Sequence, residues 1–85
     1  MMKTEMQPGK IYFISYGGNT QIVGRFSHSD TYKHYFHALL HYWNGYETFR
    51  HSDQYCVTSG ITDIRAASKS EKHALLAKEI EYETI

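Results

Sequence analysis

The segment between residues 32 and 46, YKHYFHALLHYWNGY, constrains the fold of this chain more than any other part of the sequence. Asn-Gly is the strongest two-residue signal for a type I′ turn, because both positions of that turn need positive φ, and such a turn joins antiparallel strands. Here Asn44 and Gly45 lie between a long aromatic run and the alternating run YETF. The pattern therefore predicts a hairpin in which residues 33–43 pair with residues 46–51.

A helix over residues 32–43 is the alternative. Several of its apolar residues also recur at helical spacing, and Ser29 or Asp30 would cap its N-terminus. Tyr, His and Phe are mediocre helix formers, however, and the run YETF after Asn44-Gly45 alternates like the partner strand of a two-residue hairpin turn. We therefore favour the strand.

A second hairpin is predicted nearer the N-terminus. Residues 10–16, KIYFISY, are rich in β-branched and aromatic residues, and the run QIVGRFS at residues 21–27 follows a turn of Gly and Asn. Gly24 lies in the middle of the second strand and indicates a bulge or a strong bend, a common device for curling a small sheet. The polar residues 27–31 are expected to form the next turn.

The rest of the chain predicts short strands and one helix. A polar break at Ser52-Asp53-Gln54 is followed by a short strand, YCVTS, and by a last extended segment, ITDIR. Ser68 and Glu71 form an S-x-x-E capping box, so a helix is expected at about residues 69–82. Its sheet-facing stripe is predicted to contain His73, Leu76, Ala77 and Ile80.

Eighty-five residues are enough for one domain, which we place at residues 10–85 after a flexible lead-in of residues 1–9. A domain this small has a thin core, so its largest rings, including Trp43 and Phe36, are expected to be buried. The elements together predict a mainly β (α+β) fold. We expect a small SH3-like or curled antiparallel barrel of about five strands with one C-terminal helix.

Charge and cysteine content restrict the possible functions. Nine Lys and Arg residues balance nine Asp and Glu residues, so no strong field is expected to attract nucleic acid or anionic lipid. The single cysteine excludes an intramolecular disulfide and a multi-thiolate zinc site, which is typical of a reducing compartment. No apolar stretch approaches the roughly 20 residues of a membrane span. The chain is therefore expected to act in the cytoplasm, away from membranes.

Three sequence patterns are shared with a group of known proteins. These are Lys-Ile-Tyr at residues 10–12, Ile-x-Gly-Arg-Phe at residues 22–26, and Ile-x-x-Ile-Arg-x-Ala-Ser-x-x-Glu at residues 61–71. In these patterns the chain resembles small uncharacterised proteins of phages and prophage-like regions of gut Bacteroidetes. The resemblance spans most of residues 10–80 and implies a small β-barrel with a C-terminal helix. It implies no activity, because its motifs are strands and a capped helix.

His34, His37 and His41 are the closest approach of the sequence to a metal site. Their spacings of three and four residues would place them on one face of a helix, where imidazoles suit zinc. On a strand they separate, with His34 on one face and His37 and His41 on the other. No carboxylate, Cys pair or H-E-x-x-H motif completes the site. We therefore predict no metal and no other cofactor.

A thiol enzyme is the other catalytic hypothesis. Cys56 with a nearby histidine would make a nucleophile and its base. The run Tyr55-Cys56-Val57 is instead typical of a strand in which cysteine behaves as a small buried hydrophobe. A small metal- or thiol-dependent enzyme is the less favoured alternative, and we predict no catalytic residue.

Aromatic rings beside basic residues make the candidate binding surface. Such rings stack on unpaired bases, and they are also enriched at protein interfaces. Because the net charge is zero, we expect a protein partner first and weak single-stranded nucleic-acid binding as the alternative, and an open edge strand would also permit a homodimer. The predicted function is a small non-enzymatic protein-interaction module, of the kind a mobile element encodes. The surface comprises Tyr32, Tyr35, Tyr42, Trp43, Tyr46, Arg25 and Arg50, with Lys33 beside them.

Overall fold

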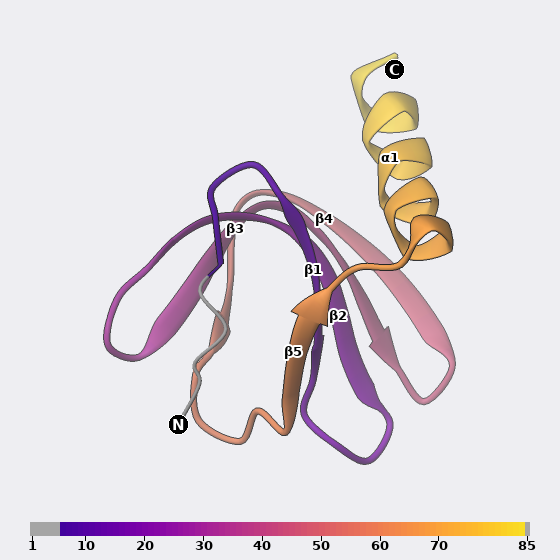
Figure 1. Ribbon diagram of the computed structural model, residues 1–85. Helices are drawn as coiled ribbons and strands as arrows, with labels where there is room; N and C mark the ends of the chain where they lie inside the picture. Colours follow the sequence, from indigo (N-terminus) through magenta and orange to yellow (C-terminus); the bar gives the residue numbers. More distant parts are fainter. Residues whose placement is uncertain (1–5, 85) are drawn as a thin grey trace.

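Five strands and one helix make up most of the chain in the computed structural model, which describes residues 6–84 (Figure 1). The strands are β1 (Ile11–Ser15), β2 (Thr20–Ser29), β3 (Lys33–Trp43), β4 (Tyr46–Val57) and β5 (Asp63–Ala66), and the helix is α1 (Lys69–Glu83). The predicted mainly β fold with a C-terminal helix is confirmed. Residues 1–5 of the expected lead-in lie outside the described residues, whereas Met6 packs against the core.

Both predicted hairpins are present. β1 and β2 pair antiparallel across a turn in which Gly17 and Gly18 have positive φ. β3 pairs with β4 from Trp43 and Tyr46 onward, and Asn44 and Gly45 have φ angles of 51° and 85°. Positive φ at both central residues is the requirement of the type I′ turn. The strand prediction for residues 33–43 is therefore confirmed, and the helix alternative is wrong.

The predicted turn at residues 27–31 begins too early and the predicted break at residues 52–54 is wrong, because strands continue through both places as bulges. β2 runs to Ser29, since the residues around its bulge at Ser27 still pair with β3. β4 runs through the expected break at Ser52-Asp53-Gln54, where Ser52 has a φ of 69° and the partner strand has one residue fewer. A bulge absorbs an extra residue and bends the strand without ending it.

The bulges of three neighbouring strands lie together and bend the sheet. Ser27 in β2 and His37 in β3 are the extra residues on either side of the Phe26–Phe36 pair, and the β4 bulge lies beside them. The bend therefore begins just after Gly24, the residue that predicted it. A Cβ at Gly24 would lie 2.6 Å from the ring of Phe36, so glycine is needed for this close approach.

The sheet is a single antiparallel one with the strand order β4-β3-β2-β1-β5. Figure 1 shows it curled into an arch, with α1 on the outside. The Tyr16 hydroxyl donates to the Val57 carbonyl and so connects the end of β1 with the end of β4. Within residues 6–84, however, the edge strands β4 and β5 do not pair with each other, so the sheet is curled without being closed along its edges.

The core has two parts, one on each face of the sheet. The inner part lies beneath the arch and contains Tyr12, Ile14, Ile22, Phe26, Phe36, Leu39 and Cys56. The outer part lies between the sheet and α1 and contains Ile11, Val23, Ala38, Leu40, Ala67 and Leu75. Phe36 is 1% exposed, as predicted for a large ring in a small domain.

The helix begins at its predicted cap. The Glu71 amide donates to the Ser68 hydroxyl across 3.3 Å, and the Ser68 amide donates to the Glu71 carboxylate across 2.7 Å. Arg65 makes a bidentate ion pair with the same carboxylate, which fixes the start of the helix to β5. Within the described residues, no helix has the length and apolar character needed to cross a membrane.

The predicted sheet-facing stripe of the helix is wrong. Leu75 is fully buried against the outer core, whereas Leu76 and Ile80 are 38% and 62% exposed. Two contacts set this rotation: Glu79 pairs with Arg25 of β2 through hydrogen bonds of 3.0 and 2.8 Å, and the Tyr82 ring stacks on His51 of β4 at 4.3 Å. The stripe of His73, Leu76, Ala77 and Ile80 consequently faces solvent.

Candidate functional site

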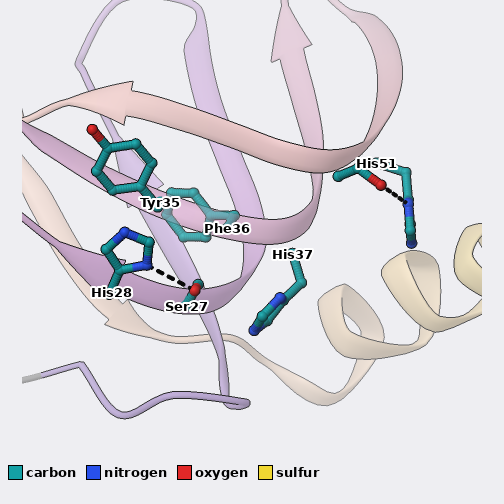
Figure 2. A pocket seen from close by; sticks show the side chains of 7 residues that line it. Ser27, His28, Tyr35, Phe36, His37 and His51 are labelled. Carbon is teal, nitrogen blue, oxygen red and sulfur yellow. Dashed lines mark hydrogen bonds between the residues drawn. The ribbon is translucent and has the colours of Figure 1, made fainter.

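The bend in the sheet contains a surface pocket of about 450 Å³, shown in Figure 2. Its lining comes from the bulged parts of three strands, where neighbouring side chains no longer alternate strictly between faces. The lining residues are Ser27, His28, Tyr35, Phe36, His37, His51 and Ser52. The pocket is therefore a product of the bulges and could not be read from strand periodicity.

The pocket offers imidazoles and hydroxyls that are already paired. Ser27 and His28 are joined through Oγ and Nδ1 at 2.9 Å, and His51 and Ser52 through the same atoms at 2.8 Å. The His28 ring also stacks on Tyr35 at 4.5 Å. Figure 2 shows the imidazoles spread along the pocket, with His51 beside the helix and His28 at the other end. This arrangement suits weak hydrogen bonding to a polar group more than proton transfer between paired residues.

The histidines predicted as metal candidates are separated. His34 lies on the inner face, bonded to Ser29 at 2.6 Å, and burial lowers the pKa of its imidazole. His41 pairs with Ile22 and shares that face, while His37 lies in the pocket on the outer face. The expected grouping of His37 with His41 is wrong because the bulge at His37 shifts the alternation. Among the side chains described, no group of three His, Cys, Asp or Glu is arranged to hold a metal ion.

Cys56 lies on the inner face in the core. Its side chain is buried, and burial raises the pKa of the thiol. An activated cysteine nucleophile needs the opposite shift, because the thiolate is the reactive form. The Tyr16 side chain lies beside it, and burial raises the pKa of that phenol as well. This environment fits a packing role for Cys56.

The residues of the predicted binding surface do not form one platform. Arg25 is occupied by Glu79, and Tyr42 packs against the outer core, where burial and a hydrogen bond to Glu47 raise its pKa to about 12. Tyr35 donates to Asp30 at 2.9 Å and lies beside Tyr55. The other predicted surface residues are also dispersed. Tyr32 is exposed in the β2–β3 turn, and Arg50 lies near His41. The Nζ of Lys33 lies 4.3 Å from the centre of the Tyr55 ring.

Two of the predicted surface residues do come together, at a site that we call the hairpin tip. Trp43 and Tyr46 are the cross-strand pair on either side of the Asn44-Gly45 turn, and they are 56% and 71% exposed. The expectation that Trp43 is buried is wrong. The ring belongs to the last pair of β3 and β4, beyond the part of the inner face that the core covers.

The hairpin tip is exposed but firmly held. The Asn44 amide donates to the Asn19 carbonyl across 3.1 Å, and the Asn19 side-chain amide donates to the Asn44 side chain across 2.8 Å. These bonds join the β3–β4 turn to the β1–β2 turn, and Trp43 also pairs with Thr20 of β2. The indole and phenol are thus presented to solvent on a backbone that is connected on two sides.

A second exposed apolar surface was not identified from the sequence. It is the outer stripe of α1, formed by His73, Leu76, Ala77 and Ile80. Their helical spacing predicts a core face, but spacing alone does not say which of two apolar faces meets the sheet. The Arg25–Glu79 pair and the Tyr82–His51 stack both lie on the side of the helix that carries Leu75 and hold that side against the sheet.

Comparisons with known proteins add no assignment: no family model matches this chain, and no curated protein or solved structure matches it either.

Proposed function

We propose that the protein is a small non-enzymatic protein-interaction module and that its partner binds the hairpin tip. The observation that carries this proposal is a solvent-exposed Trp43–Tyr46 pair on a doubly connected turn. Trp and Tyr are the residues most enriched at the centres of protein interfaces, since they bury large area with few rotatable bonds. A rigid backbone beneath them reduces the entropy lost on binding.

Charge supports a protein partner over single-stranded nucleic acid. Arg25, one of the cations expected to contact phosphates, is neutralised by the carboxylate of Glu79 at 2.8 Å. The chain as a whole carries no net charge. Nucleic-acid binding through stacking on Trp43 would therefore be weak and shallow in its salt dependence. We further propose, from the sequence patterns and the single cysteine, that the module is encoded by a mobile element and acts in the cytoplasm.

The test is affinity capture by the immobilised chain from a host lysate, with and without nuclease treatment. A partner that binds the hairpin tip is retained after nuclease treatment and is lost with Trp43→Ala. The matched control is Tyr32→Ala, which removes a ring that is even more exposed, 75% against 56%, from just before the opposite end of β3. Capture that survives Trp43→Ala would refute the assignment of the tip, and capture that disappears with nuclease would favour the nucleic-acid alternative.

A direct titration complements this experiment. Trp43 is the single tryptophan of the chain, so its fluorescence reports on the hairpin tip alone. Once a partner is captured, its addition should shift the emission to shorter wavelength as the indole leaves water. An unpaired oligonucleotide that produces the same shift with submicromolar affinity near physiological salt would replace the protein partner in this proposal.

A further inference from the structure

The outer stripe of α1 is an apolar surface that faces away from the sheet. Leu76 and Ile80 lie one turn apart with Ala77 beside them, and both large side chains are exposed. Figure 1 shows the helix rising along the outside of the arch, with its C-terminal end beyond the strands. A second helix can therefore approach this face without meeting the sheet.

The charges of α1 oppose its own dipole. Lys69 and Lys72 lie in the first turn, where the dipole is positive, and Glu81 and Glu83 lie in the last turn, where it is negative and no basic residue is present. The favourable carboxylate of the first turn, Glu71, is already bound by Arg65 and by the Ser68 amide. The two lysines and the two terminal glutamates are therefore unfavourably placed with respect to the dipole of their own helix.

We infer that a second copy of this chain covers the outer stripe, as an antiparallel helix pair. In that arrangement the basic first turn of one helix lies beside the acidic last turn of the other, twice over by symmetry. A register that sets Leu76 against Ile80 of the second copy also brings Lys72 beside Glu83 of the second copy, because both lie on the same flank of the stripe. The charges that oppose the dipole of one helix complement those of its mate.

The small area of the outer stripe limits the affinity of the dimer. Two large apolar side chains and one alanine from each helix bury far less than the roughly 800 Å² per partner of a standard interface, so the dimer is weak, with a dissociation constant on the order of 100 µM. Its charge pairs are at the rim, so raising the salt from about 0.05 M to about 0.5 M should weaken it several-fold.

Sedimentation equilibrium of the full chain, from about 10 µM to about 1 mM, tests the inference. Leu76→Glu should raise the dissociation constant at least about tenfold, because it places two carboxylates in the contact. Tyr46→Glu, the same type of change at the more exposed hairpin tip, should leave it unchanged. A wild-type chain that stays monomeric at the highest concentration, or a dimer that Leu76→Glu does not weaken, would overturn the inference.

Charge reversal tests the antiparallel orientation. Lys72→Glu and Glu83→Lys should each weaken self-association, since each places like charges together, yet each should raise the thermal midpoint of the dilute monomer by relieving the dipole. An equimolar mixture of the two variants should associate again as a heterodimer, in which both contacts pair opposite charges. A mixture that remains as monomeric as its components would show that the helices do not pair in this way.

This inference is independent of the partner at the hairpin tip. Trp43→Ala should abolish capture of that partner without changing the dimer, and Leu76→Glu should do the reverse. Loss of self-association with capture intact would therefore refute the helix pair alone. If the chain self-associates as expected but Trp43→Ala still captures the partner, the hairpin-tip proposal alone would be refuted.

Discussion

Gly24→Ala is expected to destabilise the fold through a single contact. The added Cβ would lie 2.6 Å from Cδ1 of Phe36 and 3.0 Å from its Cε1. Phe36 is 1% exposed and fills the inner core with Phe26 and Leu39, so its ring has little room to turn away. Either the ring or the backbone of β2 must shift.

The magnitude follows from two opposing effects. Inserting a methyl group into a packed core costs about 1–3 kcal/mol, whereas replacing glycine by alanine gains about 0.4–1 kcal/mol from the less flexible unfolded chain. We therefore expect a net loss of about 1.5 kcal/mol in the free energy of unfolding, which lowers the thermal midpoint of a domain of this size by roughly 6–12 °C. Thermal and urea unfolding monitored by circular dichroism measure both quantities.

A double-mutant cycle assigns the loss to the contact with Phe36. In a Phe36→Leu background the smaller side chain leaves space for the alanine methyl group, so Gly24→Ala should cost at least about 0.5 kcal/mol less than in the wild type. An equal loss in both backgrounds would mean that the backbone of β2, and not the phenyl ring, resists the methyl group. An unchanged or raised midpoint in the single variant would refute the close approach of Phe36 altogether.

Three further predictions concern other parts of the fold. Trp43→Ala should lower the free energy of unfolding by less than about 1 kcal/mol in urea, and a loss near 3 kcal/mol would mean that the ring is buried. Leu75→Ala should cost about 2–5 kcal/mol and Leu76→Ala less than about 0.5 kcal/mol; similar losses would contradict the assigned helix face. Arg65 lowers the pKa of Glu71, so this pair stabilises the fold above the unfolded-state pKa of Glu71, and the stabilisation is lost as the pH falls through the folded-state pKa. Glu71→Gln should therefore lower the thermal midpoint at neutral pH and reduce the fall of the midpoint with decreasing pH. If the midpoints of wild type and variant fell equally with decreasing pH, the role of the pair would be contradicted.

The elements with strong local signals could be predicted from the sequence. Asn44-Gly45 decided the β3–β4 hairpin against competing helical periodicity, because a type I′ turn requires positive φ at both of its central residues. Ser68 and Glu71 located the start of α1 to the residue, since a capping box depends on two side chains and the backbone next to them. Both signals act within four residues of chain.

Features that depend on distant parts of the chain could not be predicted. Ser52 adopts positive φ at a bulge, and nothing in its neighbours distinguishes a bulge from a strand end. The helix has one apolar face with Leu75 and another with Leu76. The face with Leu75 is held on the sheet by contacts between residues far apart in sequence, the Glu79–Arg25 pair and the Tyr82–His51 stack. The outer-face pocket was missed for the same reason, because it exists only where the bulges of three strands meet.

Trp43 and the outer stripe of α1 are both predicted to be buried and are both exposed, and one physical reason applies to the two. The sequence predicts that Trp43 and the Leu76–Ile80 stripe are buried, because a chain of 85 residues has few large apolar side chains to spare. The fold nevertheless builds its core from other residues and leaves these side chains 38–62% exposed, where they contribute much less to its stability than Leu75 or Phe36. Apolar side chains that a small domain leaves exposed on rigid elements are typical of interfaces. The hairpin tip and the outer stripe therefore become the surfaces where binding is best sought, and they lie on different elements, so each can be tested without disturbing the other.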